Sequence, residues 1–542
     1  MHTGSAAGSA FFGRADICAI LEKRLVAFEK GYRQNVGIVG PPSIGKSSLS
    51  RVFLERATQS EVLSIFISCL EFDSFERFAQ KWMTELLFSF HHAFQKPLPD
   101  GFQLLLRSLK GIIPKTLQRM KSVKKLILKK RYDQSYEELL GLSNVLHQEC
   151  GRKILIVLDD FDRLAELGLS DPFADLGQEI MIQKDTMFVV TSSRPFRSLS
   201  IFRDKLSLLF GNFEVVELKP FDFEESRQFI NQRCSECILD EGLKRFLIRL
   251  TDGCPYYLDL ITNRLKECSR AGDGRSNSDF LIEALTHELY DTHGMLYQHF
   301  QARLYQSAYG RPWPLFADVL LAIALGYQKL SQMTRFLHQR IGEVKKILER
   351  LIFSERITKH SAFFQIPDPL FQFWLSKVYY GRRFLIQRDP SASVSAFREE
   401  VRQAIEESIR EDQKELPKRI EELFLRFRND VVELEKQKFK CPHFTEVFSR
   451  PNNGRVFPVF ARNAGTRWLC QVVSNTVAEE DVHAFVADSK HDQGPIQKKL
   501  IVGLRGIDLN AKLLAHEAKI QYLDLRNLNF LLDLYHIPKI IL

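Results

Sequence analysis

Eight residues near the start of the chain have the types and spacing that bind a phosphate group. From Gly40 to Ser47 the sequence reads GPPSIGKS, which is the pattern G-x-x-x-x-G-K-S. Glycines permit a loop whose backbone N–H groups converge on one anion, as a phosphate requires. We expect Lys46 to reach the β- and γ-phosphates of a nucleotide, and the Ser47 hydroxyl to be a ligand of Mg²⁺.

The segments on either side of this loop support the prediction. Residues 36–39 form an apolar strand, and residues 48–56 continue as a helix whose N-terminus favours a phosphate. An ordinary glycine-rich turn between strand and helix is the alternative, but the complete pattern in this context favours a nucleotide. The predicted nucleotide-binding residues of the loop are Gly40, Pro41, Pro42, Ser43, Ile44, Gly45, Lys46, Ser47 and Ser48.

Two carboxylates follow a second apolar run and could complete the site. Residues 154–158 (ILIVL) are too few for a helix and are expected to form a strand. Asp159, at its end, would hold Mg²⁺ through water, and Asp160 would orient or deprotonate the attacking water. Asp162 is predicted to cap a helix. An apolar run ending in Asp-Asp is by itself a common strand terminus, but downstream of a phosphate loop it indicates the magnesium-binding strand of an ATPase.

Further strands are expected to bring these residues together. Residues 62–68, a run ending at Thr191 and the segment FEVVELKPF alternate with helical stretches, which indicates a parallel sheet covered on both faces. Ligands bind beyond the carboxyl ends of such strands, so Lys46, Asp159, Asp160 and residues 192–194 should share one rim. There Arg194 would sense the γ-phosphate or neutralise charge during its transfer. The alternative is a surface arginine in a loop.

Length and composition limit the classes of protein that fit. The 542 residues suffice for three or four domains, and no apolar run approaches the ~20 residues of a membrane span. The N-terminus lacks the pattern of a signal peptide and resembles a flexible leader. Nine scattered cysteines argue against a disulfide framework and favour a reducing compartment, so we expect a cytoplasmic protein. Cys234 and Cys237 are expected to be two helix cysteines one turn apart, because no second pair stands at zinc-site spacing.

The positive charge of the chain is concentrated in one segment. The chain has 76 Lys and Arg against 67 Asp and Glu, and residues 102–131 hold ten of the basic residues and no acidic one. Apolar residues interleave with them, as in basic amphipathic helices, so DNA or RNA, an anionic membrane surface or an acidic partner would suit this segment. A solvated helical face is the alternative. The ten are Arg107, Lys110, Lys115, Arg119, Lys121, Lys124, Lys125, Lys129, Lys130 and Arg131.

The rest of the chain is expected to form further domains. In the helical stretch after residue 220, Gly253 and Pro255 interrupt the chain and could place apolar groups near an adenine. Residues 313–375 read as short helices followed by a hairpin, the order of a winged helix, which can read DNA or serve only as a packing module. Lys345, Lys346 and Arg350 on its presumed recognition helix are compatible with phosphate contacts.

We predict an α/β multidomain fold built on a P-loop NTPase with a parallel sheet. The expected domains are an ATPase core at 1–220 with a basic helical insertion at about 100–150, a helical lid at 221–304 and a winged helix at 305–382. A charged helical linker at 383–427 and a C-terminal α/β domain at 428–542 follow.

Several segments together resemble one family of ATPases. FFGRADICAILEKRL, the phosphate loop, IVLDDFDRL, FVVTSSRPF and DGCPYYLDL follow the order seen in STAND and archaeal-type ATPases of the AAA+ group, over about residues 11–380. The resemblance implies that Lys46, Ser47, Asp159 and Asp160 bind ATP and Mg²⁺. It also implies γ-phosphate sensing by Arg194 and nucleotide packing at Pro255.

In the archaeal-type branch the last domain is often similar to restriction endonucleases, with an Asp and a Glu-x-Lys on adjacent strands. The order of elements in residues 430–542 resembles that PD-(D/E)xK-like fold. Gln471-Val472-Val473 stands where Glu-x-Lys is expected, and RVFPVFARN lacks the Asp. Without those groups a metal-bound water has no evident activator, so we expect a domain inactive as a nuclease that binds nucleic acid or protein. An unrelated α/β domain is the alternative.

Three functions remain open at this point. The first is an ATP-driven switch that rearranges or assembles, as a homo-oligomer or with a protein partner, in signalling, defence or mobile-element biology. The second is a DNA-handling ATPase similar to replication initiators or transposition regulators. The third is a scaffold that binds ATP without hydrolysing it, against which the pair Asp159-Asp160 argues, since a structural site needs no acid to position water.

Overall fold

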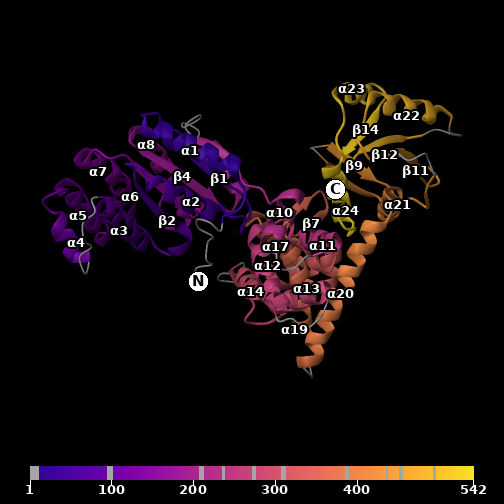
Figure 1. Cartoon of the computed structure of the whole chain (residues 1–542), viewed down its shortest axis with the longest axis horizontal. Coiled ribbons are helices and arrows are strands. Elements are labelled where there is room, and N and C mark those ends of the chain that lie inside the picture. Colours follow the sequence, from indigo (N-terminus) through magenta and orange to yellow (C-terminus); the bar gives the residue numbers. More distant parts are fainter. Residues whose placement is uncertain are drawn as a thin grey trace. The chain divides into compact units, whose positions relative to one another are not determined.

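The computed structural model describes residues 11–93, 102–206, 213–234, 239–270, 276–306, 313–384, 390–434, 437–450, 456–491 and 496–541. The chain forms two compact units (Figure 1). The N-terminal unit extends to Pro220 and includes Cys254–Tyr256, and the C-terminal unit comprises Phe221–Gly253 and the chain from Tyr257 onward. No helix of the described ranges is long and apolar enough to span a membrane. Cys237 and the leader before Phe11 lie outside the described residues.

A five-stranded parallel sheet is the centre of the N-terminal unit. Its order is β2-β3-β4-β1-β5 and every neighbouring pair is parallel. The three central strands are buried throughout, as expected for a sheet covered on both faces. The strands are β1 (Asn35–Val39), β2 (Leu63–Ser68), β3 (Ile154–Asp159), β4 (Thr186–Ser192) and β5 (Phe213–Glu217). The predicted parallel P-loop sheet is therefore confirmed.

Helices cover both faces of this sheet. Alternate residues of β3 point to opposite faces, because side chains along a strand have a period of two. Leu155 and Val157 belong to one apolar core with α1 (Ala15–Glu29) and α2 (Lys46–Ala57). Ile154 and Ile156 belong to the other, with α3 (Phe75–Ala93) and α8 (Pro172–Ile182). Apolar cores on both faces therefore hold the sheet, and with it the carboxyl ends of the strands where the predicted site lies.

The basic segment forms helices between β2 and β3. They are α4 (Phe102–Leu109) and α5 (Pro114–Leu128), followed by α6 (Tyr132–Leu140) and α7 (Leu142–Cys150). Ile113, Leu117 and Val123 are buried in the core shared with α3, which confirms an apolar side for α5. Leu128, in contrast, is 85% exposed at the end of α5, so the apolar side is shorter than the sequence pattern predicts.

The C-terminal unit begins with helices. They are α10 (Phe223–Arg233), α11 (Glu241–Thr251), α12 (Pro255–Arg270), α13 (Asn277–Leu285) and α14 (Met295–Gln306). Three more, α15 (Trp313–Ala324), α16 (Leu330–Leu337) and α17 (Ile341–Phe353), precede the hairpin of β6 (Thr358–His360) and β7 (Phe363–Gln365). This is the order predicted for residues 313–375, while the winged-helix assignment and the five domain boundaries stay predictions.

A second set of helices leads to the last sheet. It comprises α18 (Pro369–Trp374), a π-helical turn (Leu375–Tyr379), α19 (Tyr380–Phe384), α20 (Pro390–Gln413) and α21 (Leu416–Arg426). Arg249 on α11 pairs with Asp412 on α20 at 2.6 Å, and both side chains are largely buried. α20 is therefore packed against α11, while the assignment of residues 383–427 as a linker stays a prediction.

The last sheet has mixed pairing in the order β10-β11-β12-β13-β14. β10, β11 and β12 are antiparallel, and β12, β13 and β14 are parallel. From the sequence, RVFPVFARN, TRWLCQVVSN, KKLIVGLRG and IQYLDL are predicted to be strands, and AEEDVHAFVADS, DLNAKLLAHEAK and NLNFLLDLY to be helices. The structure has each of these elements. It adds β10 and the hairpin of β8 (Asp430–Leu434) and β9 (Gln437–Cys441), which the sequence does not predict. The strands of the sheet and its helices are β10 (Glu446–Ser449), β11 (Val456–Arg462), β12 (Arg467–Val473), α22 (Glu479–His491), β13 (Lys498–Gly503), α23 (Leu509–Glu517), β14 (Ile520–Asp524) and α24 (Leu525–Leu534).

Candidate nucleotide site

The phosphate loop joins β1 to α2 and leaves the start of α2 open to a ligand. Gly45 is the N-cap of α2 with a φ of 97°, a conformation that favours glycine, and no side chain caps the helix. The first N–H groups of a helix have no partner within it, so they are available to an anion. At Gly40 an added Cβ would lie 2.3 Å from the carbonyl oxygen of Leu218, the residue after β5, so this close approach requires glycine there.

The other residues of the loop either offer backbone N–H groups or attach the loop to the sheet. Pro41 and Pro42 are exposed and have no N–H, so the donors of the loop begin at Ser43, which has a φ of 64°. Ile44 is buried in the core beneath α2 and fixes the loop to the sheet. Ser48 lies in the first turn of α2 and is half-buried. That the N–H groups of the loop face inward, onto a phosphate, stays a prediction.

Lys46 lies inside the loop. Its ammonium donates to the carbonyl oxygens of Gly40 at 3.0 Å and Pro41 at 2.7 Å, and the residue is only 5% exposed. Burial lowers the pKa of Lys46, and the charges of Asp160 and Asp159 oppose that shift. A buried cation bordered by backbone donors is suited to a phosphate, which offers more negative charge than two carbonyls.

The two predicted Mg²⁺ ligands meet although 112 residues separate them. The Ser47 hydroxyl donates to Asp159 at 2.7 Å, and Thr191 at the end of β4 donates to the other Asp159 oxygen at 2.5 Å. Burial, and next the charge of Asp160, raise the pKa of Asp159. A hydroxyl and a carboxylate at the rim beside Lys46 fit Mg²⁺, which prefers oxygen ligands and keeps several waters. Among the described residues no group of three or more His, Cys, Asp or Glu could hold a metal alone, so phosphate oxygens would complete this site.

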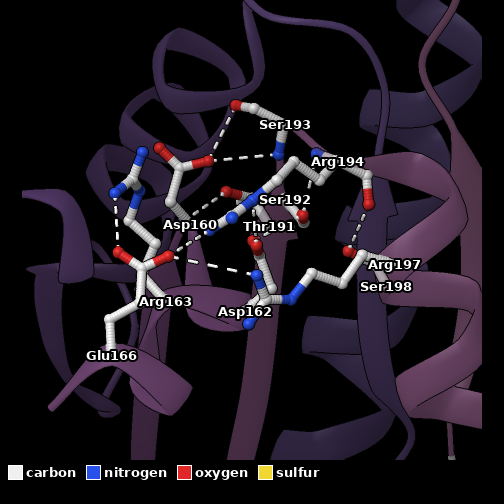
Figure 2. Close-up of polar contacts among 10 residues, drawn as sticks. All are labelled: Asp160, Asp162, Arg163, Glu166, Thr191, Ser192, Ser193, Arg194, Arg197 and Ser198. Atoms are coloured by element: carbon white, nitrogen blue, oxygen red, sulfur yellow. Dashed lines mark hydrogen bonds and ion pairs between the residues drawn. The ribbon is translucent and has the colours of Figure 1, made fainter. Parts of the chain in front are cut away.

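Asp160 is held in place by the end of β4. Its φ of 51° turns the chain away from β3, and its N–H donates to the Thr191 hydroxyl at 3.1 Å. One carboxylate oxygen accepts from both the N–H of Ser193 at 3.1 Å and its hydroxyl at 2.7 Å (Figure 2). The carboxylate is thereby oriented by two donors, as a group that positions water must be.

Arg194 lies on the same rim but is engaged by two carboxylates. Its guanidinium pairs with Asp162 at 2.6 Å and Glu166 at 2.9 Å (Figure 2). Burial alone would lower the pKa of Arg194, but its two anionic partners outweigh burial and raise it. In this arrangement Arg194 neutralises protein carboxylates, so its predicted contact with a γ-phosphate stays a prediction that requires those pairs to open.

The prediction for Asp162 is wrong. Asp160, not Asp162, precedes the short 3₁₀ helix Phe161–Glu166, so Asp162 lies inside the turn and faces β4. It is 1% exposed and accepts a hydrogen bond from the Ser192 hydroxyl at 2.6 Å besides pairing with Arg194. Burial raises the pKa of Asp162, and the charge of Arg194 counteracts this. Asp162 therefore fixes the segment after β4 instead of capping a helix.

Pro255 begins α12 beside a residue that contacts the loop. Cys254–Tyr256 belong to the N-terminal unit although the chain on both sides belongs to the other unit. The Cys254 thiol donates to the Ser43 carbonyl oxygen at 3.3 Å. The structure therefore brings Cys254 to the phosphate loop, while the placement of Gly253 and Pro255 near an adenine stays a prediction.

The sequence analysis places residues 192–194 on the rim, but it does not predict that the hydroxyls at the end of β4 are the partners of the acids at the end of β3 and just after it. Thr191 donates to Asp159, the last residue of β3, and Ser192 and Ser193 donate to acids in the segment that follows. Three polar residues at the carboxyl end of an apolar strand are a usable signal, since that end carries the ligands in a parallel sheet. Assigning partners to them needs the strand order, which places β4 beside β3.

Comparison with known proteins identifies the nucleotide domain. The family model described as an AAA ATPase domain matches residues 10–183. A search of curated proteins found no match. Among solved structures, a Walker-type ATPase of Pyrococcus abyssi is 20% identical, with a TM-score of 0.46 and coverage of 68% of this chain and 96% of that one. The Aeropyrum pernix ORC2 protein is 12% identical, with a TM-score of 0.42 and coverage of 74% and 97%.

A third solved structure, the Aeropyrum pernix ORC1 protein in complex with DNA, is 15% identical, with a TM-score of 0.40 and coverage of 70% and 96%. All three TM-scores are below 0.5, so the assignment rests on the family match and on the site. The strand order, the phosphate loop and the acids of β3 lie within or next to the matched region. Residues 10–183 match the model of an AAA ATPase domain, and the protein is an ATPase with a P-loop NTPase fold.

Proposed function

We propose that this ATPase is a switch of the STAND or archaeal type, in which the state of the bound nucleotide controls the arrangement or assembly of its domains. The observation that carries the proposal is the position of Cys254–Tyr256. This tripeptide from the start of α12 lies with the N-terminal unit, beside the phosphate loop, while the rest of α12 belongs to the other unit. A change in the loop on nucleotide binding would act directly on the chain that continues into α12.

Each residue of the rim would have a separate role in ATP hydrolysis. Backbone donors of the loop and Lys46 would bind the phosphates, and Ser47 and Asp159 would hold Mg²⁺, which when bound neutralises charge on the phosphates. Asp160, oriented by Ser193, would position the attacking water and accept its proton. Arg194 would stabilise negative charge after leaving its carboxylate partners.

Limited proteolysis of the full chain tests the switch. Asp160→Asn should bind ATP with little loss of affinity and hydrolyse it slowly. Its ATP state therefore lasts through the digestion and can be compared with its ADP state. We expect different cleavage patterns or hydrodynamic radii with ATP and with ADP. Lys46→Ala should bind neither nucleotide, so its pattern should be the same with both. Identical patterns with ATP and ADP in Asp160→Asn would exclude a switch. Unchanged turnover in that variant would exclude the role of Asp160.

A second function, handling of DNA, is favoured by the surface of α5. Lys121, Lys124, Lys125, Lys129 and Lys130 are all exposed, and Arg119 pairs with Glu138 at 2.9 Å. Lysines in such a row release counterions when they meet phosphates, so binding should weaken steeply with salt. On α17, Lys345, Lys346 and Arg350 are exposed as well, which would supply a second contact if this region is a winged helix.

Charge reversal distinguishes a DNA contact from a solvated face. Changing Lys124, Lys125, Lys129 and Lys130 to Glu should abolish DNA binding measured by fluorescence anisotropy and leave ATP turnover intact. The matched control reverses four exposed lysines elsewhere on the N-terminal unit: Lys23, Lys30, Lys184 and Lys219. Equal DNA binding by the two quadruple variants would exclude α5 as the contact.

We also propose that the C-terminal sheet binds a partner without cutting nucleic acid. Leu469, Gln471 and Val473 of β12 share one face, because side chains along a strand alternate. Leu469 and Val473 are buried in an apolar core with α22 and α23, and Gln471 is 2% exposed. In a nuclease of the restriction-endonuclease-like fold, this face of β12 would carry the Glu and the Lys of the Glu-x-Lys pattern. Here the face is apolar, apart from the amide of Gln471.

A further inference from the structure

We propose that the C-terminal unit has a second ligand site, which binds a small planar anion such as a nucleoside monophosphate or an aromatic carboxylate. The site is a cavity of about 430 Å³ between α14, α18, the π-helical turn and α19. This volume lies in the range of cavities that enclose small molecules. The proposal is independent of the phosphate loop, since all lining residues lie between Tyr297 and Arg383.

Aromatic side chains form the walls of the cavity. Trp374 is 1% exposed and its indole N–H donates to the Leu289 carbonyl oxygen at 3.1 Å, so this ring is fixed. The ring centres of Tyr297 and Tyr379 lie 5.7 and 5.9 Å from that of Trp374. Tyr305 is 52% exposed and also lines the cavity. Rigid aromatic walls favour a flat ring, because stacking costs little conformational entropy.

Arg382 supplies a cation that no protein carboxylate neutralises. Its guanidinium lies over the rings of Tyr290 and Tyr297, at 4.8 and 4.7 Å from their centres. Its described hydrogen bonds use two of its five N–H donors, one to the Tyr297 hydroxyl at 3.1 Å and one to the Tyr290 carbonyl oxygen. Within the described part of the chain it forms no ion pair, so an anion in the cavity would be its natural partner.

The neighbouring residue, Arg383, differs from Arg382 because a carboxylate neutralises it. Arg383 also lines the cavity, but it pairs with Asp318 at 3.0 Å and donates to the Tyr379 hydroxyl. The wide π-helical turn at Leu375–Tyr379 precedes both arginines, and such turns are frequent at functional sites because they change which side chains share a face. The charge available to a ligand therefore belongs to Arg382.

Calorimetric titration of the full chain tests the site. In Lys46→Ala, which should not bind nucleotide at the phosphate loop, we titrate AMP and GMP as phosphate probes and benzoate and 4-hydroxybenzoate as carboxylate probes. At least one probe should bind, and its uncharged counterpart (adenosine, guanosine or the corresponding benzamide) should bind about tenfold more weakly or worse. Which group of probes binds identifies the anion.

Variants separate the cavity from unspecific binding. Arg382→Gln should weaken binding about tenfold or more, and Arg340→Gln, which changes an exposed arginine at the N-cap of α17, should leave it unchanged. Gln301→Trp would fill the cavity while retaining Arg382, and it should abolish binding without lowering thermal stability. Failure of all four probes to bind at millimolar concentration would overturn the proposal, as would binding that neither Arg382→Gln nor Gln301→Trp weakens.

Discussion

Removal of the Ser193 hydroxyl should reduce the rate of ATP hydrolysis without weakening ATP binding. In Ser193→Ala the backbone N–H of residue 193 still donates to Asp160, but the 2.7 Å bond from the hydroxyl is lost. A hydrogen bond to a charged group contributes about 1.5–3 kcal/mol. If the bond serves to hold the carboxylate against the water, most of this energy is lost in the transition state. Since about 1.4 kcal/mol corresponds to a tenfold change in rate, kcat should fall roughly 10- to 100-fold.

Steady-state ATPase kinetics measure the effect directly. KM should change little, because Ser193 forms no described contact with the phosphate loop. Ser198→Ala is the matched control: it removes a hydroxyl that donates to the Arg194 carbonyl oxygen at 2.9 Å, on the same rim but away from Asp160. We expect kcat of that control to stay close to the wild-type value.

A double variant tests whether Ser193 acts through Asp160. Ser193→Ala should have almost no further effect in an Asp160→Asn background, since residues that act as one unit are strongly non-additive. Additive losses in the double variant would contradict the reasoning, and so would a Ser193→Ala enzyme with normal kcat or with its whole defect in KM. Binding of a fluorescent ATP analogue separates these results from loss of folding.

Further predictions concern the loop, the metal, the C-terminal unit and its sheet. Gly40→Ala should abolish ATP binding in calorimetry, because its Cβ would collide with the Leu218 carbonyl oxygen. Normal affinity would show that the backbone at Leu218 can move to accept the methyl group. Asp159→Asn should remove the gain in ATP affinity that Mg²⁺ gives and leave metal-free binding nearly intact, and an undiminished gain would exclude Asp159 as a ligand. Burial lowers the pKa of His299 to about 4, so the unfolded state binds a proton first as pH falls from 7 to 4. The contribution of His299 to the loss of unfolding free energy over that interval should be about 3 kcal/mol, so His299→Gln should lose less than wild type over the same interval, as chemical denaturation would measure. A plasmid incubated with Mg²⁺ or Mn²⁺ should stay uncut, and cleavage abolished by Gln471→Ala would refute our interpretation of β12.

The sequence is sufficient to predict those parts of the site that are local in the chain. The phosphate loop and the acids after β3 are each contained in a few residues, because a strand, a turn and a helix start follow one another there. The parallel sheet follows from strands that alternate with helices. The charge-rich hairpin β8–β9 is different: its residues have little apolar patterning, and its pairing depends on a core contributed by residues from Ile420 to Ile540.

The contacts between residues of neighbouring strands could not be predicted from the sequence. Thr191 and Ser193 become partners of Asp159 and Asp160 only because β4 lies beside β3, an order that no local pattern encodes. The same adjacency explains the error at Asp162. A carboxylate one turn beyond a strand resembles a helix cap in sequence, but the neighbouring strand ends in a hydroxyl and an arginine that bind it more strongly.

The pairing of Arg194 sets a physical condition for any response to ATP. Separating a buried ion pair by removing one partner costs about 3–5 kcal/mol, and Asp162 is almost completely buried. A γ-phosphate can draw Arg194 away only if its own attraction, together with the hydration or new partners of Asp162 and Glu166, offsets that cost. ADP lacks the γ-phosphate and offers no such compensation. The ion pairs would therefore act as a threshold that separates the two nucleotides, which a free surface arginine at the same position could not do.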